Sequence, residues 1–507
     1  MSLATLIKRL QDIMRNDTGV DGDAQRLSQI VWLLFLKIFD FKEEEAELDD
    51  DYEPVIPVGY RWRDWVTCID NDGNVDVKNQ LTGSALIDFV NNELLPVLRG
   101  NAVKDKEGND VIPFDKTDDR SLLVKEFMNR SINYMNNGIQ LRLVVNLFDE
   151  VDFSDSNETH HFNDIYETLL KSLQSAGRAG EFYSSRALTR FANQHVDPKL
   201  GETVADFSAG TGGFLVDALL HLEDQITPGD VESAKLLQTA VQGIEWKPLP
   251  YMLCVTNLLL HGVSLPNITY GDSLSKRLSD YTDKDKVDCI LMNPPYGGVA
   301  LQEDIINFPA DLRSSETADL FVALIITRLK NNGRAAVILP DGFLFGTDNA
   351  AKVNIKKKLL NECNLHTVIR LPKSCFAPYT SIATNMLFFN KTGKTQETWF
   401  YRMDMPEGYK AFSKTKPLLY EHMAPVNEWW NHRIEIKDAD TNTYKAKKYT
   451  FDEIEANGYN LDLCGYPTQE KIILSPEETM NNFIVRREEL DKLMDEKLAA
   501  IKALLEE

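Results

Sequence analysis

Short apolar runs alternate with amphipathic segments between residues 166 and 400, and this alternation restricts the fold more than any other feature of the chain. Strand-like runs that interleave with stretches of helical periodicity are typical of a doubly wound α/β sheet. In such a sheet, ligands bind beyond the carboxyl ends of the strands. We expect strands near residues 203, 242, 267, 288, 335, 367 and 385, and helices near 187, 213, 248, 317 and 350.

The regions on either side of this sheet are expected to be mainly helical. Residues 1–165 include a dense apolar stretch on a helix that starts near Asp23, and they predict either a plain helical bundle or an interaction domain. Residues 401–507 end in a helix with a capping box that begins at Ser475. Apolar residues fall on one face of that helix, at Leu490, Met494, Leu498, Ile501 and Leu505. This stripe fits either a partner helix or the chain's own domain.

The strand expected near residue 288 is followed by Asn293-Pro294-Pro295-Tyr296, which suits chemistry on a planar amine. Such an amine is a poor nucleophile, because its lone pair is delocalised into the ring. A site can assist by accepting hydrogen bonds from both amine hydrogens. The Asn293 oxygen can take one hydrogen and a backbone carbonyl the other, because proline fixes the backbone and donates nothing. Tyr296 offers a flat face to an extruded base. The alternative is a strand that ends in an Asn-Pro turn.

A glycine-rich turn, Asp206–Phe214, lies about eighty residues upstream and predicts close backbone approach to a ligand. It is neither a G-x-G-x-x-G fingerprint nor a P-loop, so a structural turn or another cofactor remains open. The next two strands end at acids. Glu245 could accept hydrogen bonds from a ribose diol, and Asp272 could accept a hydrogen bond from the amine of a cofactor adenine. The alternative is that both are surface acids.

With Gly180–Arg186 added, the chain resembles the modification subunit of type I restriction-modification systems, an adenine-specific DNA methyltransferase of the gamma motif order. The matching segments are Gly180–Arg186, Asp206–Leu215, Gly243–Glu245, Gly271–Leu274, Asn293–Gly298 and Thr380–Asn385. The resemblance implies a Rossmann-like methyltransferase sheet, with an N-terminal helical domain over 1–165, an S-adenosylmethionine-dependent methyltransferase domain over 166–400, and a C-terminal region over 401–507 that ends in a partner-binding helix.

The resemblance also implies roles for individual residues. Asn293, Pro294, Pro295 and Tyr296 would form the catalytic motif. The cofactor, S-adenosyl-L-methionine, would contact Glu181, Phe182, Tyr183, Ser184, Ser185, Arg186, Asp206, Ser208, Gly210, Thr211, Gly212, Gly213, Glu245, Asp272 and Ser273. The family usually has Thr-Pro where this chain has Ser184-Ser185, which puts the contact made by Ser185 in doubt. Phe376 would either pack on the target base or belong to the core.

The formal net charge of −23 argues either against nucleic acid or for a partner that supplies most DNA contacts, because phosphate binding needs lysine and arginine. About 115 residues follow the last motif, which is too few for a two-part target-recognition module. The resemblance implies that a separate specificity subunit reads the target in double-stranded DNA. It also implies that two modification subunits assemble with each specificity subunit, and that a restriction subunit can join this complex. Trp429, Trp430 and the lysines at 445, 447 and 448 would touch phosphate or form ordinary surface.

The remaining features narrow the class of protein. No apolar run is long enough to span a membrane, and six scattered cysteines without C-x-x-C spacing indicate a reducing cytoplasm and no metal site. The resemblance implies that this cytoplasm is bacterial or archaeal. His261 is expected to cap a helix that starts at Pro248. Three alternatives stay open: a methyltransferase for an RNA base or protein glutamine, a dinucleotide-dependent oxidoreductase, and a non-catalytic scaffold.

Overall fold

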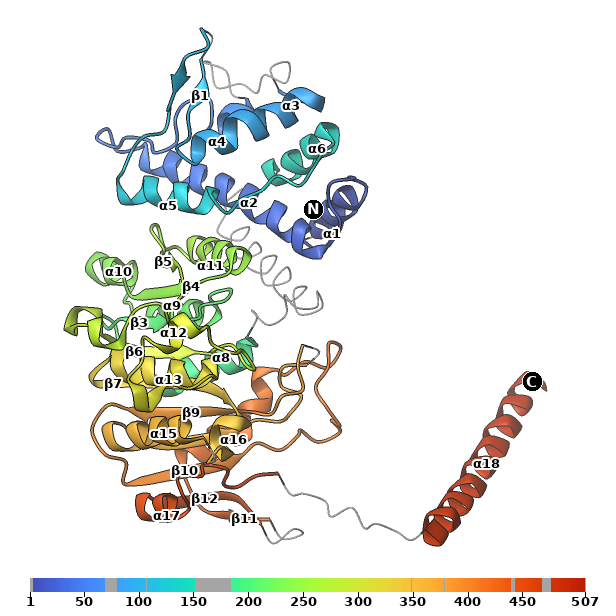
Figure 1. Ribbon diagram of the computed structural model, residues 1–507. Coiled ribbons are helices and arrows are strands. Elements are labelled where there is room, and N and C mark those ends of the chain that lie inside the picture. Colours follow the sequence, from blue (N-terminus) through green and yellow to red (C-terminus); the bar gives the residue numbers. More distant parts are fainter. Residues whose placement is uncertain are drawn as a thin grey trace. The chain divides into compact units, whose positions relative to one another are not determined.

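The computed structural model describes residues 3–68, 80–105, 107–150, 184–347, 349–377, 379–438, 443–466 and 476–506. Met1–Gly465 form one compact unit and Tyr466–Glu507 form a second. The first unit contains an N-terminal helical part and a large sheet with its helices (Figure 1). The expected fold class, an α/β sheet with a helical N-terminal region and a helical tail, is confirmed. The domain boundaries expected near residues 165 and 400 stay predictions.

The N-terminal part is built around α2, Asp23–Ala46, the helix that the apolar stretch predicts. Its middle is buried on every side, because the other helices of this part and α11 (Pro248–Leu260) pack around it. A short hairpin, β1 (Val103–Lys104) with β2 (Asp110–Val111), adds to them. The surrounding helices are α1 (Leu3–Arg15), α3 (Gly83–Phe89), α4 (Leu95–Leu98), α5 (Asp119–Met128) and α6 (Gly138–Asp149).

The sheet has ten strands in the order β11-β12-β10-β8-β9-β7-β6-β3-β4-β5. The strands from β5 to β7 are parallel, β9 runs antiparallel between β7 and β8, and β12 runs antiparallel to β10. All seven expected strands are present, and three more, which lie between residues 397 and 450, extend the sheet. The strands are β3 (Val204–Asp206), β4 (Val241–Glu245), β5 (Asn267–Tyr270), β6 (Val287–Met292), β7 (Leu329–Pro340), β8 (Asn364–Arg370), β9 (Thr384–Asn390), β10 (Glu397–Arg402), β11 (Ile436–Lys437) and β12 (Tyr444–Thr450).

Helices cover both faces of the sheet, as the alternation in the sequence predicts (Figure 1). Successive strand residues point to opposite faces, so Leu291 joins the core on one side while Ile290 and Met292 join the core on the other. The first side carries α8 (Arg186–Val196), α9 (Gly213–Glu223), α11 (Pro248–Leu260) and α16 (Ala424–Asn431); the second carries α13 (Thr317–Arg328), α15 (Ala350–Glu362) and α17 (Phe451–Ala456).

Helix α11 is apolar around its whole circumference, which a helix on one face of a sheet does not need. It contacts both the sheet and α2 of the N-terminal part, so it has no solvent-facing side to fill with polar residues. His261 follows its last turn and contacts the Asn257 carbonyl oxygen at 2.8 Å through Nδ1. The capping role expected for His261 is confirmed.

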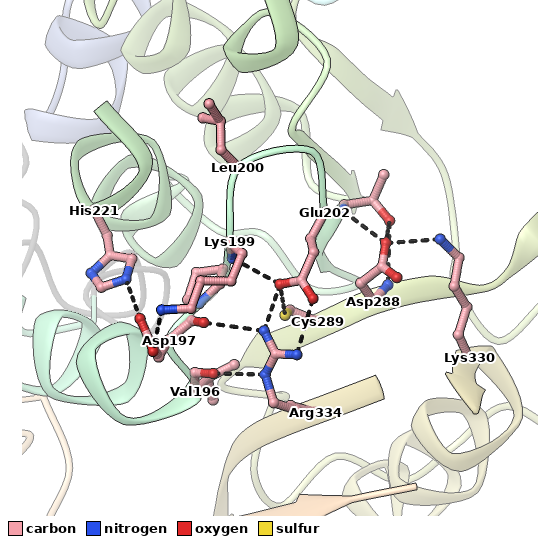
Figure 2. A network of polar contacts seen from close by, with 12 residues as sticks. Val196, Asp197, Lys199, Leu200, Glu202, His221, Asp288, Cys289, Lys330 and Arg334 are labelled. Carbon is pink, nitrogen blue, oxygen red and sulfur yellow. Dashed lines mark hydrogen bonds and ion pairs between the residues drawn. The ribbon is translucent and has the colours of Figure 1, made fainter. Parts of the chain in front are cut away.

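The amino ends of the central strands are closed by a network of ion pairs and hydrogen bonds (Figure 2). Arg334 of β7 donates to Glu202 at 2.5 and 3.0 Å and to the Val196 carbonyl at 2.8 Å. Lys330 pairs with Asp288 at 2.8 Å beside it. These contacts fill the edge of the sheet where β3, β6 and β7 begin, which leaves the opposite, carboxyl edge for a ligand.

Two buried arginines hold the end of the first unit. Arg370 of β8 donates to the Leu463 carbonyl at 3.3 Å, and Arg402 of β10 donates to the Gly465 carbonyl at 3.1 Å. The second unit contains α18, Pro476–Glu506, on which Leu490, Met494 and Leu498 are exposed. Ser475 and the side chains of Ile501 and Leu505 lie outside the described residues, so the capping box and the full apolar stripe stay predictions.

Candidate active site

A cavity of about 330 Å³ opens where β3, β4, β5 and β6 end side by side. This volume lies at the lower end of the range for small-molecule sites. The segments that follow these four strands are far apart in the sequence, and parallel pairing brings them together at one edge. The lining includes Ser184, Asp206, Ser208, Gly210, Thr211, Gly213, Glu245, Asp272, Ser273 and all four residues of the Asn293–Tyr296 motif.

The glycine-rich turn after β3 has the backbone form that its sequence predicts. Gly210 and Gly212 have φ values of 55° and 79°, a left-handed conformation that side chains rarely adopt. A Cβ at Gly212 would lie 2.9 Å from the Cys254 Sγ of α11, so this glycine allows the turn to pack on α11. Gly210, by contrast, lines the cavity.

Asp206 ends β3 at the base of the cavity, where it is 1% exposed. Its Oδ1 accepts the Ser208 amide at 2.9 Å. Burial raises the pKa of Asp206 to about 8, and the nearby Glu245 adds to the rise. The carboxyl group therefore sits at a site that disfavours its charge, which is common where a cavity is shaped for a ligand.

Glu245 ends β4 and fastens the glycine-rich turn to it. Oε2 accepts the Gly210 amide at 2.9 Å, and Oε1 accepts the Lys247 amide at 2.8 Å. Burial raises the pKa of Glu245, against the effect of these hydrogen bonds. Each carboxylate oxygen has a second lone pair, so both can still accept a donor from the cavity.

Asp272 and Ser273 follow β5 on the far side of Glu245. Asp272 Oδ1 accepts the Leu274 amide at 2.8 Å, which fixes the turn. The Ser273 hydroxyl donates to the Phe207 carbonyl at 2.6 Å and ties this turn to the one after β3. The strand-end acids thus form a row along the cavity in the order β3, β4, β5.

The Asn293–Tyr296 motif follows β6 and closes the other side of the cavity. Asn293 Nδ2 donates to Ser184 Oγ at 3.1 Å, and the Tyr296 hydroxyl donates to Asn293 Oδ1. Ser208 Oγ donates to the Asn293 carbonyl at 3.3 Å, so the motif is also held by the glycine-rich turn. Both polar side-chain atoms of Asn293 are thereby bonded to other residues that line the cavity.

Comparison with known proteins identifies the family to which a chain with this site belongs. Residues 157–473 match the family model described as N-6 DNA Methylase, and residues 3–148 match the HsdM N-terminal domain. The type I restriction enzyme EcoEI methylase subunit of Escherichia coli is 46% identical over 98% of this chain and 97% of its own length.

The chain belongs to the N-6 DNA methylase family.

Two solved structures agree with this assignment. A modification subunit of a putative type I restriction enzyme from Vibrio vulnificus is 38% identical, with a TM-score of 0.74 over 89% of this chain and 92% of that one. A chain solved in work on complex assembly and conformational transition of the type I R-M system is 30% identical, with a TM-score of 0.78 over 97% of both chains. The methylase is a type I modification subunit that methylates the N6 amine of adenine in DNA, which excludes the oxidoreductase and scaffold alternatives.

The structure separates the residues expected at the methylase's cofactor site into two groups. Ser184 lines the cavity, whereas Ser185 is the N-cap of α8, accepting the Ala187 amide at 3.4 Å and donating to the Leu418 carbonyl at 3.4 Å. Arg186 donates to the Gly213 carbonyl at 3.0 Å and so supports the glycine-rich turn. Gly212 packs on α11, as described above. Glu181, Phe182 and Tyr183 lie outside the described residues.

The motifs in the sequence did not point to several residues that line the cavity, among them Trp246, Tyr379 and Asp304. Trp246 lines it and is 50% exposed, and its only signal is its place after a strand-end acid. Tyr379 lines it from the loop after β8. Asp304 lines it at 6% exposure, and burial together with the charge of Asp272 raises its pKa. Nothing in the sequence around Asp304 distinguishes it from a surface acid.

Phe376 belongs to the core, as one of its two expected roles requires, and its packing on a target base stays a prediction. It is 6% exposed and part of the core, and it also lines the cavity, where its ring meets the Tyr296 ring edge-on at 6.1 Å between centroids. Within the residues that the structure describes, no group of three or more histidine, cysteine or acidic side chains is arranged to hold a metal. The described helices include none long and apolar enough to cross a membrane.

Proposed function

We propose that the cavity binds S-adenosylmethionine along the ends of β3, β4 and β5, and that Asn293 holds the target adenine amine at its other side. One observation carries the proposal: Glu245, Asp272 and Asn293, which come from three different strand ends, line the same cavity. The proposal assigns the two acids to a nucleoside on one side of the cavity and Asn293 to an exocyclic amine on the other, because each is an acceptor of the kind that these groups need.

The residues present fit the proposed cofactor. Glu245 keeps free lone pairs for a ribose diol, and Asp272 can accept an exocyclic amine beyond it. The left-handed Gly210 leaves room for close approach, because no side chain stands between its backbone and the cavity. When bound, the cofactor supplies an electrophilic methyl group. The chain's own residues orient it and keep it away from bulk water.

The base side requires an exchange of hydrogen bonds. Asn293 Oδ1 accepts the Tyr296 hydroxyl in this structure. An incoming adenine amine would take that place and donate its second hydrogen to a backbone carbonyl of the Asn-Pro-Pro turn, which directs the nitrogen lone pair toward the methyl group. An amide does not take up a proton at neutral pH, so Asn293 acts by accepting a hydrogen bond and the amine loses its proton to solvent after transfer.

We further propose that the methylase works in a complex with a specificity subunit on double-stranded DNA, with two modification subunits for each specificity subunit, and that a restriction subunit can join. The net charge of −23 and the exposed apolar residues of α18 support a divided task, in which a partner supplies most DNA contacts. The six free, buried cysteines and the bacterial and archaeal relatives support a cytoplasmic setting.

The test uses the full chain purified together with its specificity subunit. The melting temperature should rise when S-adenosylmethionine is added and should not rise with NAD. NAD is not expected to bind, because the glycine-rich turn lacks the dinucleotide-binding fingerprint. Transfer of tritiated methyl groups to duplex DNA, followed by mapping of the modified base, then identifies the acceptor. Label at RNA or at protein glutamine, with none at adenine N6, would reject the assignment of the base site.

A further inference from the structure

Two segments of this acidic chain contain lysines and no acids. Residues 371–380 include Lys373, and residues 408–420 include Lys410, Lys414 and Lys416, while neither segment has an aspartate or glutamate. Both segments therefore add positive charge to a chain whose formal net charge is −23. Their positions in the fold decide whether they act together.

Both segments lie at the carboxyl edge of the sheet, where the cavity opens. The first follows β8 and the second follows β10, and these strands are parallel neighbours. The Phe412 amide donates to Ser374 Oγ at 2.9 Å, which joins the two segments two residues from the cavity-lining Phe376. On the other side, Ser185 donates to the Leu418 carbonyl, next to the cavity-lining Ser184. The lysine segments are therefore bonded to the rim of the cavity at both ends.

The cations of these segments are available to a partner. Lys373, Lys410, Lys414 and Lys416 are exposed, and none of them forms an ion pair with another described residue. Arg190 of α8 is also exposed and lies over the Tyr420 ring, 4.6 Å from its centroid, at the end of the second segment. We call these five residues the basic rim.

The lysines of β12, which the sequence offered as candidates for phosphate contacts, differ from the basic rim. Lys445 pairs with Asp404 at 2.9 Å and Lys448 pairs with Glu397 at 2.8 Å. Lys447 lies over the Tyr449 ring, 4.4 Å from its centroid. Two of the three charges are neutralised within the sheet, so β12 has less to offer a polyanion.

We propose that the basic rim contacts the phosphates of the DNA strand that carries the target base into the cavity. Phosphate contacts position a protein on DNA without reading its sequence, which suits a subunit whose partner reads the site. The basic rim gives a strongly acidic chain a set of exposed cations near the cavity, between the flanking acids Glu407 and Glu421, with which it can contact phosphate. This inference rests on the proposed base site and adds a DNA-binding surface to it.

The test compares two quadruple variants in the complex with the specificity subunit. The first, Lys373→Gln, Lys410→Gln, Lys414→Gln and Lys416→Gln, removes four charges from the basic rim. The matched control removes four exposed lysines that lie shortly before β4, β6, β8 and β10, and so toward the amino edge of the sheet: Lys235→Gln, Lys284→Gln, Lys357→Gln and Lys394→Gln. Fluorescence anisotropy of a labelled duplex, measured over a range of salt concentrations, gives affinity and salt dependence for each.

Each phosphate contact contributes about 0.9 to the slope of log affinity against log salt, so the rim variant should lose up to about 3.6 of that slope. Its affinity should fall more than about tenfold at about 0.1 M salt, while cofactor affinity and assembly persist. An unchanged slope, an equal loss in the control variant, or loss of assembly with the specificity subunit would each overturn the inference. If the wild-type complex itself fails to methylate adenine, the proposed function fails instead.

Discussion

The Tyr296 hydroxyl donates a hydrogen bond to Asn293 Oδ1, and Asn293 in turn donates to Ser184. The amide that we assign to the target amine is therefore occupied from within the protein before any base arrives. Tyr296 lies against Phe376, and burial raises the pKa of its hydroxyl, so it remains a neutral donor at physiological pH. A base that enters must replace this hydroxyl, which makes Asn293 and Tyr296 the first pair to test.

Asn293→Ala should reduce methyl transfer by at least about 100-fold, the order of effect seen when one aimed hydrogen-bonding group is removed from a catalytic site. S-adenosylmethionine affinity should stay near the wild-type value, because Asn293 faces the base side. Asn293→Asp keeps an acceptor oxygen in place and should retain more activity than alanine. Tritiated methyl incorporation and calorimetry together check this. Equal loss of transfer and cofactor binding would move Asn293 to the cofactor side.

Tyr296→Phe and Tyr296→Ala should behave differently. Phenylalanine keeps the ring and frees Asn293 Oδ1, so capture of the base should change little. Alanine removes the stacking surface, which is worth about 1–3 kcal/mol per base. Fluorescence of 2-aminopurine at the target adenine reports extrusion in the assembled complex. If alanine leaves the fluorescence enhancement intact, another ring, such as Phe376 or Tyr379, supplies the stacking surface.

Glu245→Ala and Gly212→Val should both weaken binding of S-adenosylmethionine, but by different routes. Glu245→Ala removes the proposed ribose acceptor and the bond to the Gly210 amide. Gly212→Val forces a side chain against Cys254 and requires a left-handed valine, so the melting temperature should fall together with affinity. Glu245→Gln keeps the size of the side chain but offers one acceptor oxygen in place of two, so its loss of affinity should come with a smaller fall in melting temperature than that of Gly212→Val. Unaltered calorimetric affinity in both variants would place the cofactor elsewhere.

The fold was largely predictable from the sequence, whereas the orientation of individual site residues was not. The seven expected strands and the helices between them were correct because apolar periodicity and proline or glycine punctuation are local signals. Ser185 belongs to a cofactor motif by resemblance, yet its hydroxyl caps α8, because its neighbour Ser184 occupies the cavity side. Which of two adjacent serines turns inward depends on contacts with Asn293 and Leu418, far away in sequence.

The strands after residue 400 were missed for a related reason. The sequence of β12 looks like a loop or ordinary surface because it contains Lys445, Lys447 and Lys448. Its strand conformation follows from pairing with β10, where Lys448 forms an ion pair with Glu397 of the neighbouring strand. Asp304 gave no signal at all, because an acid in a short helix is usually exposed. Its place in the cavity follows from how the chain folds back after Tyr296.

Asp206 predicts a pH dependence of stability. Its pKa is raised to about 8 in the folded protein, from about 3.8 when unfolded. Between these values the folded state binds more protons than the unfolded state, so this group makes the protein less stable as pH rises, until about pH 8. Asp206→Asn keeps the oxygen that accepts the Ser208 amide and removes the titration. The variant should therefore melt above the wild type, by a margin that grows from pH 5.5 to pH 8. A margin that is constant or shrinks over this range would contradict the raised pKa.

The last prediction concerns the division of tasks. Alone, this chain should bind S-adenosylmethionine but neither recognise nor methylate a specific DNA site, because its net charge of −23 opposes general DNA binding outside the basic rim. Leu498 is exposed on α18, and Ile501 lies one turn further along the predicted stripe. Replacing both with aspartate places charges in an apolar contact, which should prevent assembly while the first unit keeps its melting temperature.

Methylation should fall with assembly while cofactor affinity persists, and size-exclusion chromatography with the specificity subunit reports assembly directly. A control pair on the polar side of the same helix, Glu488→Gln and Lys492→Gln, should assemble normally, because it changes charge without touching the apolar stripe. Site-specific methylation by the isolated wild-type chain would refute the divided task. Normal assembly of the Leu498→Asp and Ile501→Asp variant would refute only the role of α18, since the specificity subunit would then dock on the first unit.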